Sequence, residues 1–541
     1  MSDNDRFTAS GIALKPYYTR EDFAETTEAQ RPAMPGKPDY SRGIFEQGYR
    51  SAPWIESFAC GYSLPEETNK RAKFLARTGQ KGFQGRASIN LVFDRPTFCG
   101  LDSDHPLAES EVGNIGVIID SLDDMERLFK DFPLDNLNVG LIVDRSGPFI
   151  MAMYIALADR HGIPRDKLRG IVTNNPLTDM FCSKTPMFPA QASMRLMADC
   201  IAFCAQETPK FNTCRINAYN TRELGANAIQ EVGFNLAIAR AVVKEGVKLG
   251  MTPDDVARRI NYQFSQGPDF FEDICKVRAA RRIWTRILID EFGIKDHTAA
   301  RLKIHSQTAG SSLTAQEPLN NIARIAIQVV QAALSGTQSM HVDAYDEALG
   351  IPTEESVRVA VKTSKIVMHE TGICNVADPL GGSYYVEALT DEIERRCVEV
   401  MDEVERLGGV AVALDTGYFE QEIANTSYLE NREYESGRKI KVGVNAYREE
   451  SSSSFGEVVF RPDDAVSAIA VKRVKQLRAQ RDQKAAQACI EAIKQAVRNN
   501  EPVMPRYVEA AKANVTMGEM VSAVESVVGR FQYMPIIPNV A

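Results

Sequence analysis

The sequence predicts an α/β protein built on a (β/α)8 barrel. Short apolar, strand-like runs alternate with longer helical runs from about residue 56 to about residue 400. Repeated strand–helix units of this kind form parallel sheets, and the length of the run favours a closed barrel over an open sheet. The expected strands are 87–93, 138–144, 170–175, 213–219, 302–308 and 337–342, with helical runs such as 149–162 and 225–250 between them.

The segments on either side of residues 56–400 differ from the barrel in composition. Residues 1–55 are polar and rich in proline, so we expect an extended arm that lies on the rest of the protein. Residues 401–541 are expected to form a helical C-terminal module for association with a partner or with a second copy. Its helical signal comes from runs at 391–409, 463–500 and 514–531.

Composition narrows the classes of function. The 541 residues carry a formal net charge of -9 and show no basic stripe, so nucleic acid is not an expected partner. No stretch of about 18 apolar residues indicates a membrane span. The first residues lack an apolar signal region, and the ten cysteines are scattered singly. We therefore expect a cytoplasmic protein with reduced thiols.

Short catalytic motifs do not identify the chemistry. The sequence has no GxxxxGK[ST] loop, no GxGxxG after a strand, no HExxH and no EF-hand loop. Its six histidines are dispersed, so a metal site built from them is not expected.

Polar residues gather at the expected strand ends, where most barrels carry Val, Ile and Leu. If they point inward, the interior is polar and should meet water or a long polar ligand, because unsatisfied buried polar groups are costly. Alternatively, they lie in loops just past the strands. They are Thr173, Asn174, Asn175, Asn212, Asn217, Asn220, His305, Ser306 and Gln307.

Long strings of the sequence resemble the methylmalonyl-CoA mutase family, in order and over nearly the whole chain. They are RG and APW within 42–54, FCGLDSDHP (98–106), PKFN (209–212), VRAARRIW (277–284), AGSSLTAQEPLNNIARIAIQ (309–328), GTQSMHVDAYDEALGIPT (336–353), GICNVADPLGGSYYVEALT (372–390) and VGVNAY (442–447). The resemblance implies a (β/α)8 TIM barrel threaded along its axis by coenzyme A, with small polar side chains lining the tunnel. It also implies adenosylcobalamin as the cofactor and a radical 1,2-rearrangement of an acyl-CoA.

The cobalt-ligating DxHxxG motif of that family has no counterpart in the last hundred residues. The resemblance therefore implies a catalytic large subunit that shares adenosylcobalamin with a separate small cobalamin-binding subunit, in a heterotetramer or a larger assembly.

Several residues match the family's site strings. The resemblance places Lys210 and Arg282 near coenzyme A, where a guanidinium suits a phosphate. It places His305 and Gln307 along the coenzyme A chain. It matches Tyr219 to a catalytic tyrosine of the family. On the side of the cofactor it places Glu223, Gly310 and Gln328.

The acyl end departs from the methylmalonyl-CoA mutase pattern. Ala59 stands in place of a tyrosine, Ser183 in place of the arginine that binds the substrate carboxylate, and Thr173 in place of a glutamine. Asn220 replaces a histidine, and Gln328 replaces a glutamate. A carboxylate without its arginine would be desolvated and unpaired. We therefore expect a bulkier or branched acyl group rather than methylmalonyl, with Asn220 still able to donate to the thioester carbonyl.

Two interpretations of the chain stay open. One is an active mutase for an acyl-CoA other than methylmalonyl-CoA. The other is a subunit that binds coenzyme A but has lost catalysis. Four arginines are candidates for binding a substrate carboxylate or for structural roles, and Cys60, beside Ala59, could quench a radical or simply pack. The arginines are Arg86, Arg95, Arg145 and Arg215.

Overall fold

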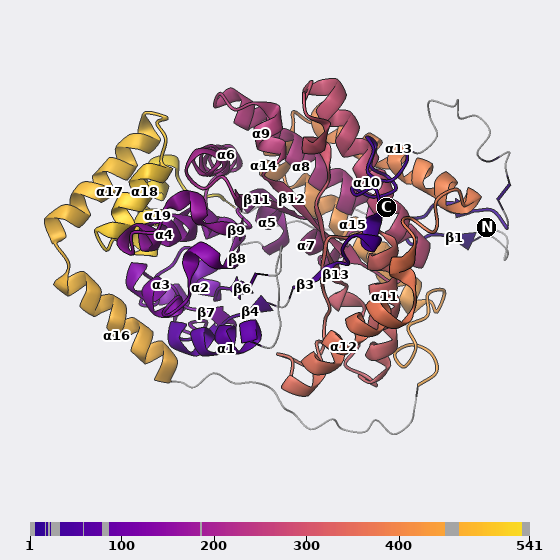
Figure 1. The fold of residues 1–541 in the computed structure, drawn as a ribbon, viewed down its shortest axis with the longest axis horizontal. Coiled ribbons are helices and arrows are strands. Elements are labelled where there is room, and N and C mark those ends of the chain that lie inside the picture. The colour runs from indigo at the N-terminus through magenta and orange to yellow at the C-terminus, as the bar shows by residue number, and fades with distance from the viewer. Residues whose placement is uncertain are drawn as a thin grey trace.

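The computed structural model describes residues 6–16, 18–19, 22, 33–57, 59–77, 86–183, 187–448 and 465–532. Within these ranges, two five-stranded parallel sheets face each other and close into a barrel (Figure 1). The strands are β3 (Ile55–Glu56), β4 (Ala59–Cys60), β6 (Ser88–Val92), β8 (Asn138–Ile142), β9 (Arg169–Val172), β10 (Phe211–Asn212), β11 (Cys214–Asn217), β12 (Ile260–Gln266), β13 (Ile304–Thr308) and β14 (Ser339–His341).

Two barrel positions are split between the sheets. β3 pairs with β14, whereas β4, a few residues later, pairs with β6. In the same way β10 pairs with β9, and β11, which follows Thr213, pairs with β12. The ten short strands therefore fill eight positions of one closed parallel ring. This confirms the predicted barrel. Two of its strand positions, β3–β4 and β12, were not predicted from the sequence.

Helices surround the ring and connect successive strands, as parallel strands require. They are α1 (Pro65–Arg77), α3 (Leu122–Leu128), α4 (Gly147–Arg160), α6 (Ala190–Glu207), α8 (Ala228–Lys248), α9 (Pro253–Ala257), α10 (Phe270–Arg286), α11 (Asn320–Leu334) and α12 (Glu354–Glu370). Shorter helices follow the carboxyl ends of three strands: α2 (Arg95–Phe98), α5 (Pro176–Ser183) and α7 (Ala218–Glu223).

The apolar cores lie between the ring and its helices rather than inside the ring. On β12, Tyr262 and Phe264 face outward into one core, and the Tyr262 ring lies 5.5 Å from that of Trp284 on α10. Asn261 and Gln263, which alternate with them, line cavities inside the barrel. A second core surrounds β6 to β9 on the other side. The interior of the barrel is thereby left to polar side chains.

The N-terminal arm lies on the barrel. Tyr40 is buried, and its hydroxyl donates to the carbonyl of His297 at 3.0 Å. The Ala9 amide donates to Asp269, just before α10, at 2.9 Å.

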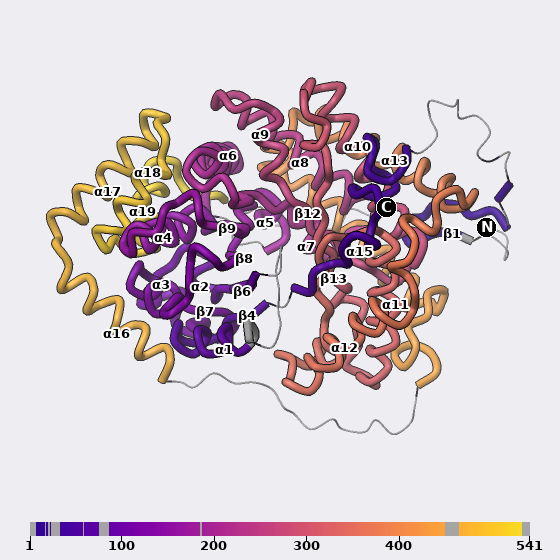
Figure 2. Tube along the Cα trace, in the orientation of Figure 1, coloured from indigo at the N-terminus to yellow at the C-terminus, as the bar shows by residue number. Residues whose placement is uncertain are grey.

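The helices after the barrel form two groups on opposite sides of the molecule (Figure 2). The first group contacts α8 and α10 and consists of α13 (Tyr384–Arg406), α14 (Val410–Asp415) and α15 (Tyr418–Glu435). The second packs against α4, where Tyr507 and Phe149 lie 4.6 Å apart. It consists of α16 (Ala465–Gln480), α17 (Gln483–Arg498), α18 (Met504–Lys512) and α19 (Met517–Val528).

The structure differs from two expectations for the C-terminal region. The helical run 463–500 is two helices, because the Asp482 side chain accepts from the Ala485 amide and starts α17 afresh. The expected domain boundary after residue 400 falls inside α13. Among the described helices, none combines the length and apolar character needed to cross a membrane.

Candidate active site

Two cavities follow each other along the barrel axis. The amino-end cavity, about 1040 Å³, is lined by residues at the start of the strands, such as Ser88 and Asn138. The carboxyl-end cavity, about 530 Å³, is lined by residues at their ends, such as Val92 and Ile142. Three residues line both cavities: Ser57, Arg215 and His305. The two cavities therefore make up one channel through the barrel.

The polar residues expected in the interior divide into two groups. Asn212, Asn217, Asn220, His305 and Gln307 line the channel. The others do not line it and are buried beside it: Thr173, Asn174, Asn175 and Ser306.

Cations predominate in the amino-end cavity. Its charged lining residues are Arg42, Arg169, Lys210, Arg215, Arg278, Arg281 and Lys303, with Glu56 and Asp378. Arg42 and Arg278 share Asp378, at 2.6 and 2.8 Å. The remaining cations give this cavity a positive potential, which attracts phosphates.

Arg281 is one of the buried cations of this cavity, and Lys303 is partly buried. Arg281 is 1% exposed and donates to the carbonyl of Gly336 at 2.8 Å, and burial lowers its pKa to about 10. Lys303 donates to the carbonyl of Arg258 at 2.5 Å. Its pKa falls to about 8 because it is buried near the positive charges of Arg259 and Arg258. Lys210 also lines the cavity, with Nζ 3.8 Å from Asp166.

Arg282 lies elsewhere, contrary to the expectation from the sequence. Its guanidinium lies against α13, where it donates to Asp391 at 2.5 Å and to Glu387 at 3.2 Å. It lines neither cavity. Neighbouring helical residues point about 100° apart, whereas residues three apart share a face. Arg278 and Arg281 therefore reach the cavity from α10, and Arg282 does not.

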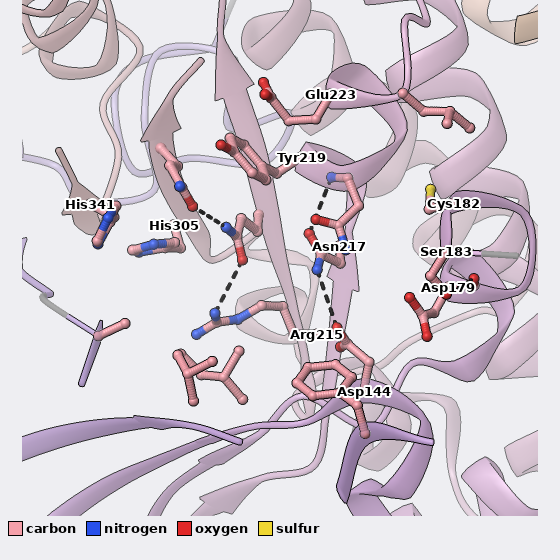
Figure 3. Close-up of a pocket in the computed structure, with 18 of the residues that line it drawn as sticks. Asp144, Asp179, Cys182, Ser183, Arg215, Asn217, Tyr219, Glu223, His305 and His341 are labelled. Atoms are coloured by element: carbon pink, nitrogen blue, oxygen red, sulfur yellow. Dashed lines mark hydrogen bonds between the residues drawn. The ribbon is translucent and has the colours of Figure 1, made fainter. Parts of the chain in front are cut away.

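A chain of hydrogen bonds crosses the carboxyl-end cavity (Figure 3). Arg215 donates to the Gln263 amide oxygen at 3.2 Å, and the Gln263 amide nitrogen donates to Gln307 at 2.8 Å. Gln307 in turn donates to Asp343 at 3.0 Å. Each partner fixes the orientation of the next amide, so the cavity presents oriented dipoles to a ligand.

Helix α7 presents three of the expected site residues, Tyr219, Asn220 and Glu223, to this cavity. The Asn217 side chain begins the helix by accepting from the Asn220 amide at 3.4 Å. Glu223 accepts from the Ser311 amide at 2.7 Å. Burial, followed by the nearby carboxylates, raises the pKa of Tyr219 well above its usual value. Tyr219 is therefore a neutral phenol that can donate a hydrogen bond.

The two histidines of the cavity are neutral. His305 Nδ1 lies 2.8 Å from the Ser339 hydroxyl, and His341 Nδ1 lies 3.0 Å from the Ser57 carbonyl. Burial lowers the pKa of both, and the Arg215 charge lowers that of His305 further. Both rings can hydrogen-bond without carrying charge at pH 7.

One wall of the carboxyl-end cavity is largely apolar, formed by Ala59, Val92, Phe98 and Ile142. Ser183 lines it too, and its hydroxyl donates to the Asp179 carbonyl at 2.8 Å. Thr173 lies behind this cavity, and its hydroxyl oxygen accepts from the Val143 and Asp144 amides at 2.9 and 2.7 Å.

Of the four candidate arginines, Arg95 and Arg215 line the carboxyl-end cavity. Arg86 donates to Asn136 at 2.6 Å, and Arg145 pairs with buried Asp179. Cys60 belongs to the apolar core beside β6 and does not line the channel, so its position fits the packing interpretation.

Comparison with known proteins identifies the family. Residues 7–530 match the methylmalonyl-CoA mutase family. The chain belongs to that family. It is 35% identical over 531 residues to the 2-hydroxyisobutanoyl-CoA mutase large subunit of Aquincola tertiaricarbonis, covering 98% of this chain and 93% of that protein. It is 36% identical over 531 residues to methylmalonyl-CoA mutase of Escherichia coli, covering 97% and 72%.

A mitochondrial relative gives the same result. The human methylmalonyl-CoA mutase is 34% identical over 523 residues, covering 96% of this chain and 68% of that enzyme. These relatives are mutases, so the predicted enzyme class, an isomerase, is confirmed. Their names include both methylmalonyl- and 2-hydroxyisobutanoyl-CoA mutases at similar identity.

Mutases of this family use adenosylcobalamin, and residues at the carboxyl end of the barrel fit a large polar cofactor. A Cβ at Gly310 would lie 3.4 Å from Glu223 Oε2 and 3.5 Å from the Tyr219 hydroxyl, so the glycine leaves these groups accessible. Asp343 Oδ2, 3.8 Å from the same point, is buried and has no hydrogen-bond partner within the described chain. Gln328 lies behind, where it supports this loop by accepting from the Ala309 amide at 3.1 Å.

The channel residues Asp144, Gln263 and Arg281 were not predicted from the sequence, and neither was Asp343, which accepts a hydrogen bond from Gln307. Gln263 had a usable signal, since INYQFSQ alternates apolar and polar residues as a half-buried strand does. Asp144 is the last residue of the expected strand 138–144, at the carboxyl end where barrel sites form. No comparable signal distinguishes Arg281 from Arg282.

Proposed function

We propose that this chain is the acyl-CoA-binding large subunit of an adenosylcobalamin-dependent mutase that rearranges the carbon skeleton of a bulky or branched acyl-CoA other than methylmalonyl-CoA. The observation that carries this proposal is the channel, which is cationic at its amino end and has an apolar wall, containing Ala59, at its carboxyl end. Ser183, rather than an arginine, stands beside that wall.

The amino-end cavity suits the phosphates of coenzyme A. Arg281 is buried there and Lys303 is partly buried, and within the described residues neither forms an ion pair with a carboxylate. Lys210 lies exposed at the rim. A phosphate would receive charge-assisted hydrogen bonds from these groups, which are stronger than neutral ones. The polar strand residues between the cavities would then contact the pantetheine arm.

The thioester would lie where the two cavities meet. His305 and Arg215 line both, and Asn220 and the neutral phenol of Tyr219 lie on the carboxyl side. These groups can hold the thioester carbonyl by hydrogen bonds and need not move a proton. The radical chemistry of the rearrangement is supplied by adenosylcobalamin when it is bound. The contribution of the protein is to orient the acyl group and to exclude water from it.

The proposal includes a separate small cobalamin-binding subunit. The chain aligns with 93% of a relative that is itself named a large subunit. A heterotetramer or larger assembly would bring the small subunit to the carboxyl end of the barrel, where Glu223 and Gly310 lie.

The test is a reconstitution. The purified chain, a small cobalamin subunit and adenosylcobalamin are mixed with a panel of branched, hydroxylated and dicarboxylic acyl-CoAs, and isomers are identified by mass spectrometry. We expect turnover of a branched or hydroxylated substrate and little or none of methylmalonyl-CoA. Binding of coenzyme A esters without any cob(II)alamin or isomer across the panel would instead support the non-catalytic interpretation. Preferred turnover of methylmalonyl-CoA would contradict the assigned substrate class.

A further inference from the structure

Asp144 is a buried carboxylate at the acyl end of the channel that the proposed reaction does not use. It follows β8, is 2% exposed and lines the carboxyl-end cavity beside Asn217 (Figure 3). One oxygen, Oδ2, accepts from the Asn217 amide at 3.3 Å. The other, Oδ1, is buried and has no hydrogen-bond partner within the described residues. A buried acceptor without a donor is energetically costly, and a ligand that donates to it would offset that cost.

The local structure holds Asp144 in an unusual backbone conformation. Its φ is 21°, in the left-handed region that residues other than glycine rarely adopt. The Thr173 hydroxyl oxygen maintains this turn by accepting from the amides of Val143 and Asp144. Strain of this kind persists where the surrounding structure fixes it, and it gathers at functional sites. Thr173 is thus a positioning residue for Asp144.

Among the described residues, no arginine or lysine forms an ion pair with Asp144. Arg145, the next residue, pairs with Asp179, and Arg215 donates to Gln263. Burial and the nearby Asp179 charge raise the pKa of Asp144 to about 7, against the opposing effects of the nearby Thr173 hydroxyl, the Asn217 amide and the Arg215 charge. The carboxyl group therefore changes charge near neutral pH and is a strong acceptor once ionised.

Asp144 lines the same cavity as the apolar wall. Ala59, Val92 and Ile142 offer no hydrogen bond from their side chains, so an acyl group packed against them would be recognised by shape alone. A carboxylate on the acyl group would be repelled by an ionised Asp144, whereas a hydroxyl could donate to Oδ1.

We propose that Asp144 is a specificity-determining residue that accepts a hydrogen bond from a hydroxyl group on the acyl chain. The inference rests on the proposed function, because it requires an acyl-CoA in the channel. It deepens that function by naming a class of substrate, the hydroxyacyl-CoAs, and the residue that selects it.

Calorimetric binding of paired esters to the full chain tests the inference. Each pair differs only in the hydroxyl: 2-hydroxyisobutanoyl- against isobutanoyl-CoA, and 3-hydroxybutanoyl- against butanoyl-CoA. We expect the hydroxylated ester of at least one pair to bind about 10- to 100-fold more tightly. Asp144→Leu should remove that preference, so that the two esters of a pair bind with similar affinity, and Asp144→Asn should reduce it. The matched control is Asp135→Asn, the same change at an exposed residue near the opposite end of β8, which should keep the preference.

The outcomes separate this inference from the proposed function. Equal affinities within both pairs, or a preference that survives in Asp144→Leu, would overturn the role of Asp144 while leaving the mutase proposal intact. Tighter binding of 3-aminobutanoyl-CoA than of its hydroxyl analogue would overturn the choice of a hydroxyl donor. Failure of every ester to bind the unaltered chain would overturn both proposals.

Discussion

The two ends of the channel are built from the same parallel strands but carry different charge. Cations predominate at the amino end, including buried Arg281 and partly buried Lys303. Carboxylates gather at the other end, at Asp144, Asp179 and Glu223, beside the cations Arg95 and Arg215. Because strand residues alternate in direction, a few substitutions at either end can set the potential there without disturbing the outer cores. The difference gives the channel a direction, and in the proposed complex the phosphates lie at one end and the reacting group at the other.

The largest expected effect concerns the cationic end. Arg281→Ala should weaken the affinity for coenzyme A by about 10- to 100-fold, because a charge-assisted hydrogen bond contributes about 1.5–3 kcal/mol. Isothermal titration with free coenzyme A measures it. Arg282→Ala is the matched control on the same helix and should change this affinity less than about twofold, because Arg282 pairs with Glu387 and Asp391 instead. A larger loss of affinity in Arg282→Ala than in Arg281→Ala would contradict this prediction and support the role expected for Arg282 from the sequence.

A second prediction concerns the space at the acyl end. Ala59→Phe should lower kcat/KM for a branched acyl-CoA by about 10- to 100-fold more than for a linear one, because the ring would fill the apolar wall. Competition between the two substrates in the reconstituted enzyme gives the ratio directly. Cys60→Ala, one residue along the strand, alters the outer core and should leave the ratio unchanged. An unchanged ratio in Ala59→Phe would show that the acyl group does not occupy this wall.

A third prediction uses pH to compare the ends. Burial near Arg258 and Arg259 lowers the pKa of Lys303 to about 8. The lysine is charged below that pH and loses its charge above it, so the affinity for coenzyme A should fall several-fold between pH 7 and pH 9. Lys303→Arg keeps its charge throughout this range and should flatten the profile. A profile that is the same in both proteins would assign the dependence to another group.

The smallest effect is on stability at the acyl end. The pKa of Asp144 is raised from 3.8 to about 7 in the folded protein, so the folded state binds the proton more tightly than the unfolded state. Its contribution to stability therefore falls as the pH rises from about 4 to about 7. Asp144→Asn should raise the Tm by about 1–3 °C at pH 8 and by less at pH 5, as followed by scanning fluorimetry. A lower Tm at pH 8 would mean that the ionised carboxylate stabilises the fold.

The sequence was sufficient for the architecture but not for every part of the ring. Six of the strand positions were expected from their apolar runs, whereas β12 carries polar residues at every second position and was missed. The first position was missed because β3 and β4 are only two residues each and directly follow the arm. Periodicity detects buried apolar faces, and a polar channel weakens that signal from the inside.

The site residues were also predicted only in part. Residues matched to family strings, such as Tyr219, Glu223 and His305, do line the channel. Arg282 does not line the channel. It lies one residue further along α10 than Arg281, so its side chain points toward α13 and pairs with Asp391 there. Asp144 could not be recognised as unusual before its burial and its unpartnered oxygen were known.

The closed ring also has a fixed length along its axis, and in the proposed complex that length sets the distance between the phosphates and the reacting carbon. From Ile304 to Thr308, β13 spans roughly 13 Å at about 3.3 Å per residue. With the phosphates anchored at one end, the position of the reacting carbon is set by the reach of the carrier arm and not by the acyl group itself. Substitutions at the far end, such as Ala59 and Ser183, can therefore change which acyl group is accepted without changing where it is presented. In such a scaffold the range of substrates can evolve separately from the alignment that the reaction needs.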